Sequence, residues 1–134
     1  MERSELYEKG AAIRRQMVGD NPMMEERLSM IENLDPEMLR YINEFSYGTI
    51  YARPRFSVKQ RQLLAQMANI VLDRAEVRPH IRNALNLGWE KEDVMEVIAT
   101  SVVYGGFPVA ASALKLADEV FREWDAEQEE GQAD

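Results

Sequence analysis

The sequence predicts an all-α fold, a compact domain built from several helices. Apolar residues recur at spacings of three and four along most of the 134-residue chain, and this is the period of an amphipathic helix. No alternation of apolar and polar residues is long enough to indicate a sheet. Turn sequences such as "VGDNP" and "GGFP" separate the periodic segments, so we interpret each segment as one helix.

Two short helices are expected first, over about 2–17 and about 23–33. The stretch "VGDNP" between them contains a glycine and a proline, which end a helix and form a turn. Asp35 before Pro36 predicts the N-cap and first position of a third helix, which is expected to end near Tyr47.

The segment "SYGTIYARPRFS", residues 46–57, is the most irregular part of the chain. It is aromatic and basic, and it contains Gly48 and Pro54. We expect a loop here, and loops of this kind often line a binding site.

A long helix is expected from its cap, Ser57, to about Asp73. Its buried stripe is predicted to consist of apolar residues at helical spacing: Leu63, Leu64, Met67, Ile70 and Val71. The next helix is expected over about 76–87. Pro79 lies in its first turn, where a missing N–H is harmless, and Gly88 ends it.

Two more helices complete the expected fold. The segment "KEDVMEVIATSVVY", residues 91–104, is apolar nearly all round in its second half, which predicts burial on every side. A last amphipathic helix begins after Pro108. Without a repeat or a low-complexity linker, we expect one helical domain over 1–122 and a solvated, frayed acidic tail over 123–134.

The net charge of −8 is concentrated at the C-terminus. Six acidic and no basic residues lie from Glu123 onward, which leaves 18 acidic against 16 basic residues before it. Residues 53–82 instead have a local charge of +5, because two acids oppose seven cations: Arg53, Arg55, Lys59, Arg61, Arg74, Arg78 and Arg82. This excess suits a small anionic ligand, and a merely solvated basic surface is the alternative.

Several functions are disfavoured by what the sequence lacks. The absence of cysteine excludes thiol peroxidase, disulfide-exchange and thiolate-metal chemistry. The chain has one histidine and no Glu-x-x-His pair, so we expect no metal site. It also lacks a nucleotide-binding fingerprint, so we expect no cofactor. No apolar run reaches the length of a membrane span, and no nucleic-acid-binding motif is present. We therefore expect a soluble, cytoplasmic protein that binds neither nucleic acid nor membrane.

The single histidine, His80, belongs to a small group of residues that suits acid–base chemistry. Glu76 lies four residues before it on the same face of the expected helix, so its carboxylate would orient the imidazole. Arg61 on the preceding helix would reach the same space if the two helices are antiparallel. Three hydroxyls lie near expected helix ends, those of Tyr47, Tyr51 and Tyr104. Each residue also has a purely structural explanation, as a core histidine, an ion pair or packing.

Five segments, in order and spacing, resemble the carboxymuconolactone decarboxylase family over about residues 7–121. "YEKGAAIRRQMVGD" is similar to the family's opening helix, "EFSYGTIYARP" to its aromatic loop and "SVKQRQLLAQMANIVL" to its central helix. "EVRPHIRNALNLGWEKEDVMEVIATSVVYGGFPVAASAL" resembles the signature, in which a His-x-Arg-x-Ala-Leu helix leads through a glycine to a helix ending Tyr-x-Gly-x-Pro. The resemblance implies an all-helical fold of the carboxymuconolactone decarboxylase and alkylhydroperoxidase D-like type, assembled as a homo-oligomer, a trimer or hexamer.

The family includes thiol peroxidases with a Cys-x-x-Cys pair just before the histidine, at the positions of Asp73 and Glu76 here. The resemblance is therefore to the cysteine-less branch. It implies cofactor-free decarboxylation of a carboxylated lactone such as 4-carboxymuconolactone, giving 3-oxoadipate enol-lactone and CO2 in the β-ketoadipate pathway of aromatic catabolism. The alternatives are an isomerase or hydrolase of another small acid on the same scaffold, or a non-catalytic oligomer that binds a small ligand.

This reaction requires a site that holds carboxylates and stabilises a dienolate, since the departing carboxylate is conjugated to the lactone carbonyl. On this reading the catalytic residues are His80, which supplies a proton, Glu76 and Arg61. Donors at the lactone oxygen would be a tyrosine hydroxyl or a backbone N–H near the glycines that follow residue 104. The expected substrate-binding residues are Tyr47, Gly48, Tyr51, Arg78, Tyr104 and Gly106.

Four positions depart from the family pattern. Tyr47 and Tyr51 stand where tryptophan is expected, Leu87 where an asparagine commonly precedes the glycine, and Thr100 where histidine or glutamine is common. A missing polar group leaves substrate atoms unpaired at a cost of about 1–3 kcal/mol. We expect these changes to affect the choice of substrate more than the fold.

Overall fold

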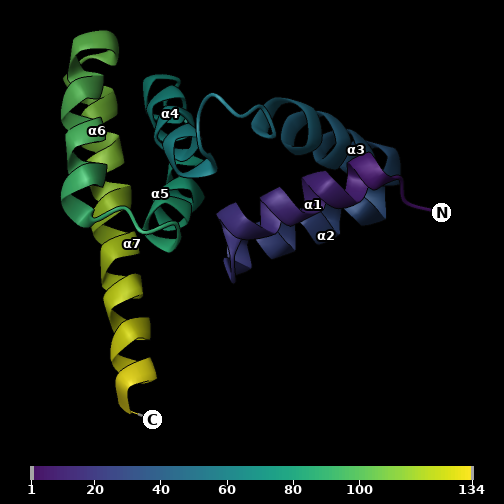
Figure 1. Ribbon diagram of the computed structural model, residues 1–134. Helices are drawn as coiled ribbons and strands as arrows, with labels where there is room; N and C mark the ends of the chain where they lie inside the picture. Colours follow the sequence, from purple (N-terminus) through teal and green to yellow (C-terminus); the bar gives the residue numbers. More distant parts are fainter. Residues whose placement is uncertain (1, 134) are drawn as a thin grey trace. The chain divides into compact units, whose positions relative to one another are not determined.

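The computed structural model describes residues 2–133, and the chain forms two compact units, Met1–Arg61 and Gln62–Asp134. Seven α-helices and one π-helix account for most of the described residues, and no β-strand occurs among them (Figure 1). The predicted all-α fold is confirmed. The single domain expected over 1–122 stays a prediction.

The first unit contains three α-helices, one π-helix and the start of the next α-helix. These are α1 (Glu5–Val18), α2 (Pro22–Leu34), α3 (Pro36–Tyr41), the π-helix η1 (Ile42–Tyr51) and α4 (Val58–Val71). Side chains cap the first three, because a backbone N–H in each first turn donates to Ser4, Asn21 or Asp35. The start predicted from Asp35 and Pro36 is confirmed, and Ser57 likewise accepts a hydrogen bond from the Gln60 N–H at 3.1 Å.

The π-helix corrects the loop expected over 46–57. The helical path continues through Tyr51, and only 52–57 are irregular. The wide turn is supported locally, because the Thr49 hydroxyl donates to the Glu44 carbonyl five residues earlier at 2.8 Å. Packing supports it too: a Cβ on Gly48 would lie 2.8 Å from the Leu6 carbonyl oxygen, so only glycine allows η1 to approach α1 this closely.

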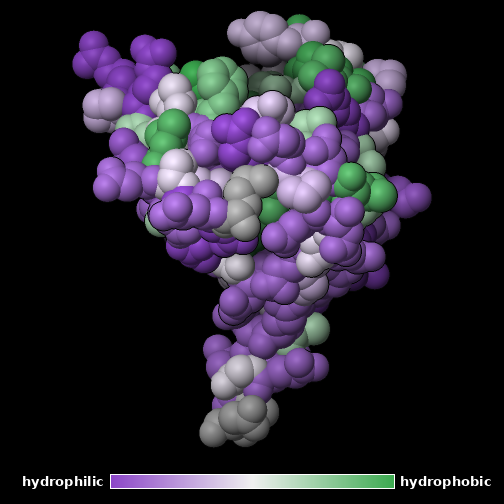
Figure 2. Space-filling view, turned by 90° about the vertical axis from the view of Figure 1, so that its right-hand side faces the viewer, coloured by the Kyte–Doolittle hydropathy of each residue, from purple (hydrophilic) through white to green (hydrophobic). Residues whose placement is uncertain are grey.

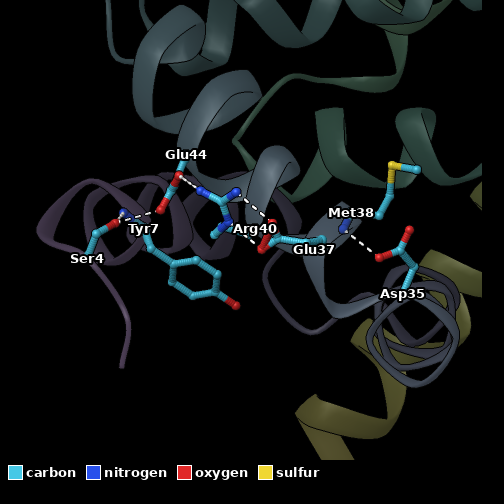
Figure 3. Close-up of polar contacts among 7 residues, drawn as sticks. All are labelled: Ser4, Tyr7, Asp35, Glu37, Met38, Arg40 and Glu44. Carbon is cyan, nitrogen blue, oxygen red and sulfur yellow. Dashed lines mark hydrogen bonds and ion pairs between the residues drawn. The ribbon is translucent and has the colours of Figure 1, made fainter. Parts of the chain in front are cut away.

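A polar network joins the beginning of α1 to α3 and η1 (Figure 3). Glu44 accepts a hydrogen bond from Ser4 at 2.7 Å and pairs with Arg40 at 3.1 Å. Arg40 also forms two hydrogen bonds to Glu37, at 2.6 and 2.7 Å, which lower the pKa of the Glu37 carboxyl. Exposed pairs of this kind contribute little energy one by one, so the network mainly sets the relative position of these elements.

The second unit consists of most of α4 together with α5 (Val77–Asn86), α6 (Lys91–Gly105) and α7 (Phe107–Ala133). α7 packs against both α5 and α6. Its buried face is built largely from small residues, which let the helices approach closely. The core consists of Ile70, Val77, Ile81, Ala84, Leu85, Val94, Ile98, Ala110, Ala113, Ala117 and Val120.

The buried face of α4 differs from the apolar stripe that was expected. Gln62, Gln66 and Ile70 are fully or almost fully buried, whereas Leu64 is 56% exposed. These three buried residues lie four apart, so they share one face of the helix. The prediction is confirmed for Ile70 and wrong for Leu64. It missed the two glutamines, which are buried because the backbone carbonyls of α5 and α6 accept their hydrogen bonds.

The second half of α6 is also less buried than expected. Ile98 and Ser101 face the core, but Val103 and Tyr104 are 77% and 74% exposed. The core of this unit therefore takes up one face of the helix and leaves apolar side chains on the other. None of the helices among residues 2–133 has the length and apolar character needed to cross a membrane.

The C-terminal segment is helical through Ala133 and is not the frayed end that was expected. Three of its acids have partners on α5 and α6: Arg78 pairs with Glu123, Arg82 with Glu127, and Lys91 with Asp125. Figure 2 shows this lower end of α7 as mainly hydrophilic. Residues 123–132 are nevertheless exposed, apart from the half-buried Trp124, so this segment is a solvent-exposed helix in which three acids form ion pairs.

Candidate functional site

His80 lies in the first turns of α5, directly after the buried Pro79. Its Nδ1 is 3.0 Å from the amide nitrogen of Gln62, and the same nitrogen donates to the His80 carbonyl oxygen at 3.0 Å. Gln62 is fully buried on α4. One side chain therefore contacts both the ring and the backbone of the histidine.

Glu76 lies one helical turn before His80, as the sequence predicted. It stands at the N-cap position of α5, and its carbonyl accepts a hydrogen bond from the His80 N–H at 3.2 Å. Its side chain is half-buried. The backbone therefore holds Glu76 and His80 at the spacing that a contact between the Glu76 carboxylate and the His80 imidazole requires.

The arginines of α5 are paired with acids of α7. Both terminal nitrogens of Arg78 bond carboxylates, one to Glu119 and one to Glu123. Arg82 makes two hydrogen bonds to Glu127, at 2.9 and 2.7 Å. The positive charge expected over 53–82 is therefore partly neutralised by residues far along the chain.

Arg61, at the end of the first unit, has a different environment. Its guanidinium carbon lies 5.8 Å from the ring centres of both Tyr51 and Phe56, a distance at which a cation is attracted to an aromatic face. One terminal nitrogen donates to the Arg53 carbonyl at 3.3 Å. Its Nε is buried and has no hydrogen-bond partner among the described residues, which makes it an unsatisfied donor.

Tyr47 and Tyr51 lie one turn apart on η1, with ring centres 5.2 Å apart in an edge-to-face arrangement. Burial raises the pKa of Tyr47 to about 12, with a further contribution from Tyr51 and an opposing one from Arg14. Burial also raises the pKa of Tyr51, and Arg61 opposes the shift. Both hydroxyls therefore keep their protons at neutral pH and can donate hydrogen bonds.

The remaining predicted residues have identifiable structural roles. Gly48 is buried where α1 and η1 meet. Gly106 has a φ of +88°, a conformation that favours glycine, and it separates α6 from α7. Tyr104 is exposed at the end of α6.

Two groups of predicted residues are thus brought together. In the first unit, Tyr47, Tyr51 and Arg61 form an aromatic and cationic cluster. In the second unit, Glu76 and His80 lie one turn apart. No group of three His, Cys, Asp or Glu side chains among residues 2–133 is placed to hold a metal ion.

Gln62 was missed by the sequence analysis. The available signal was the recurrence of glutamine at positions 62 and 66, which lie eight and four residues before the apolar Ile70 on the same helical face. A buried polar side chain is more informative than a buried apolar one, because it requires partners. Sequence alone does not reveal which side of the helix is buried.

An open apolar groove of about 340 Å³ lies between α4 and α6. Thr100, one of the departures from the family pattern, lines it, and its hydroxyl donates to the Glu96 carbonyl at 2.9 Å. The carboxylates of Asp93 and Glu96 also line this groove. An anionic substrate would be repelled there, so the groove is a poor candidate for binding one.

The comparisons with known proteins agree with the resemblance seen in the sequence. Residues 36–119 match the model of the carboxymuconolactone decarboxylase family. A 4-carboxymuconolactone decarboxylase of Acinetobacter baylyi is 26% identical over 92% of both chains. A nitrosuccinic acid decarboxylase (npaB) of Metarhizium robertsii is 28% identical over 81% of this chain and 76% of its own. An uncharacterized 15.0 kDa protein of Paracoccus denitrificans is 31% identical over 80% of this chain and 83% of its own.

Proposed function

Since the chain belongs to the carboxymuconolactone decarboxylase family, we propose that it is a cofactor-free carboxy-lyase acting on a carboxylated lactone such as 4-carboxymuconolactone. The observation that carries this proposal is Arg61, whose buried Nε lacks a partner and whose guanidinium lies beside two aromatic rings. Two relatives named as decarboxylases support carboxy-lyase activity at the level of the family.

The chemistry requires no electron sink besides the substrate itself. Loss of CO2 from a carbon conjugated to the lactone carbonyl leaves a dienolate, whose negative charge is shared with the lactone oxygen. The protein must hold the carboxylates, place donors where this charge develops and allow one proton to reach the dienolate carbon.

We assign the carboxylate to Arg61 and the N–H donor at the reacting centre to His80, with Glu76 as the group that orients the ring. Tyr47 and Tyr51 are assigned as neutral hydroxyl donors, because burial keeps them protonated. Arg78 would first have to leave Glu119 and Glu123, so it ranks below Arg61 as the carboxylate-binding residue. Gly48, Tyr104 and Gly106 are further proposed contacts.

A second substrate class is favoured by the relative named nitrosuccinic acid decarboxylase. Loss of CO2 from the carbon that bears a nitro group leaves a nitronate, whose negative charge is again shared with oxygen. The same donors would serve both reactions. We therefore include small nitro acids as the second candidate substrates, beside carboxylated lactones.

The test is CO2 release from 4-carboxymuconolactone and from nitrosuccinate, without added metal or cofactor, by the wild type and three variants. We expect His80→Gln to lower kcat by about 10²–10³-fold, the usual effect of removing one donor to a developing oxyanion. Arg61→Gln should mainly raise KM. Arg55→Gln, which changes an exposed cation of the same segment, should leave both constants unchanged and serves as the control.

The proposal fails if the wild type releases CO2 from neither substrate faster than buffer does. An undiminished rate for His80→Gln would instead reject the role of His80 while leaving the decarboxylase activity in place. Because decarboxylation would still be observed, it would give no reason to prefer an isomerase, a hydrolase or a small-ligand-binding protein.

A further inference from the structure

We propose that Gln62 is a positioning residue, which holds the His80 ring in the neutral tautomer with its proton on Nε2. The inference begins with the two contacts of the Gln62 amide, one to Nδ1 of His80 and one to the His80 carbonyl, both at 3.0 Å. The catalytic consequence rests on the proposed function, whereas the tautomer itself does not.

The orientation of the Gln62 amide follows from the backbone. The His80 carbonyl oxygen can only accept, so the amide end that faces it must be the nitrogen. The opposite orientation would place two oxygen acceptors 3.0 Å apart. The Gln62 oxygen is buried and accepts no hydrogen bond from the described residues, so the orientation of the amide is set by the His80 carbonyl.

The tautomer follows from this orientation. The amide nitrogen carries two hydrogens, one for the carbonyl and one for the ring. Nδ1 must then be the acceptor, because a proton on Nδ1 would face an N–H of the amide. In a neutral imidazole one nitrogen accepts and the other donates, so the proton lies on Nε2.

The position of Gln62 makes this arrangement hard to change. Its side chain is fully buried, and α4 presents it on the same face as Gln66 and Ile70. Water has no access to compete for the amide hydrogens. A glutamine also cannot gain or lose a proton near neutral pH, so the amide always donates at this position.

The tautomer restricts what His80 does in the proposed reaction. Nε2 carries a proton and cannot act as a base, and Nδ1 is occupied by Gln62. Gln62 thus replaces Glu76 as the residue that orients the ring. His80 therefore donates an N–H hydrogen bond to the oxygen on which negative charge develops, as neutral imidazoles do in other enzymes that form enolates. Water supplies the proton that the dienolate carbon takes up, and the ring returns unchanged after each turnover.

The test is ¹⁵N NMR of the imidazole ring, which needs no assignment because the chain contains one histidine. Under mildly alkaline conditions we expect a protonated-type signal for Nε2 and an acceptor-type signal for Nδ1. A wild-type spectrum with the proton on Nδ1, or with both tautomers averaged, would overturn the proposal.

Variants of Gln62 test whether the Gln62 amide determines the tautomer of His80. Gln62→Glu replaces the amide donor by a carboxylate that only accepts, so the proton should move to Nδ1. Gln62→Met removes the hydrogen bond and should give a mixture of tautomers. Gln66→Met is the matched control, because Gln66 is equally buried but donates to the Val94 carbonyl at 3.2 Å; its ring signals should match those of the wild type. Unchanged signals in Gln62→Glu would contradict the proposal.

Kinetic measurements then distinguish failure of the tautomer proposal from failure of the proposed decarboxylase function. Gln62→Met should lower kcat about 3–10-fold relative to Gln66→Met, the range expected for one hydrogen bond, with little change in KM. If neither candidate substrate is decarboxylated, the proposed function fails, but the spectra still decide the tautomer. If the Gln62→Met variant does not fold, the wild type and Gln62→Glu carry the test.

Discussion

At the scale of single residues, the burial of Tyr47 predicts a response of the protein to alkaline pH. Burial raises its pKa to about 12, whereas the unfolded chain titrates near the ordinary value of 10.0. Between these two values the unfolded chain loses the proton first, so the free energy of unfolding falls as the pH rises. We predict that stability toward urea declines between these two pH values and that Tyr47→Phe reduces the decline.

The measurement is urea unfolding across this pH range, combined with titration of tyrosinate absorbance in the folded protein. Tyr47→Phe should remove the most alkaline part of the absorbance change. Tyr41→Phe, which alters an exposed tyrosine, is the control and should not affect that part. If Tyr47→Phe instead removes absorbance that appears near pH 10, the result would contradict a pKa of Tyr47 raised by burial.

At the scale of elements, the contact between α1 and η1 depends on Gly10. A Cβ at this position would lie 1.6 Å from the Asn43 carbonyl oxygen and 2.9 Å from the Gly48 nitrogen. Backbone atoms of a neighbouring helix cannot move aside as a flexible side chain would. We therefore predict that Gly10→Ala lowers the free energy of unfolding by about 1–3 kcal/mol, as overpacking usually does.

Gly131→Ala is the matched control for this prediction. It makes the same substitution in a helix, but no atom lies within 4 Å of the added Cβ. Alanine is the better helix former, so this change should leave stability equal or slightly higher. Thermal unfolding of both variants measures the difference. Equal melting temperatures for Gly10→Ala and the wild type would show that α1 and η1 are not in close contact.

At the scale of the whole molecule, the apolar surface of α6 and α7 predicts self-association. An open apolar groove of about 310 Å³ is lined by Met95, Ile98, Ala99, Val102, Phe107, Ala110, Ala111 and Leu114. Phe107 is 76% exposed there. Apolar patches of this kind commonly mark interfaces, so we propose that a second copy of the chain covers the groove in a trimer or hexamer.

Light scattering tests this prediction directly. The mass should be three or six times the 15.5 kDa of the chain, and Phe107→Glu should lower it. Leu34→Glu introduces the same charge at an exposed apolar residue outside the groove and should leave the mass unchanged. A stable monomer of the wild type would overturn the prediction.

The sequence by itself determined the features that depend on near neighbours. The start of α3 at Asp35 and Pro36, the cap at Ser57, the end of α5 before Gly88 and the break at Gly106 all follow from residues within one turn. The spacing of Glu76 and His80 also belongs here, because one turn of helix fixes it. Such features need only local backbone preferences and short-range hydrogen bonds.

Only the tertiary structure decided the features that depend on distant partners. Gln62 contacts His80 across 18 residues of sequence, and Arg82 contacts Glu127 across 45. The burial of α4 on its glutamine face, the helical C-terminal segment and the π-helix against α1 arise in the same way. Periodicity indicates that a helix has a buried face, but the neighbours that pack against it decide which face is buried.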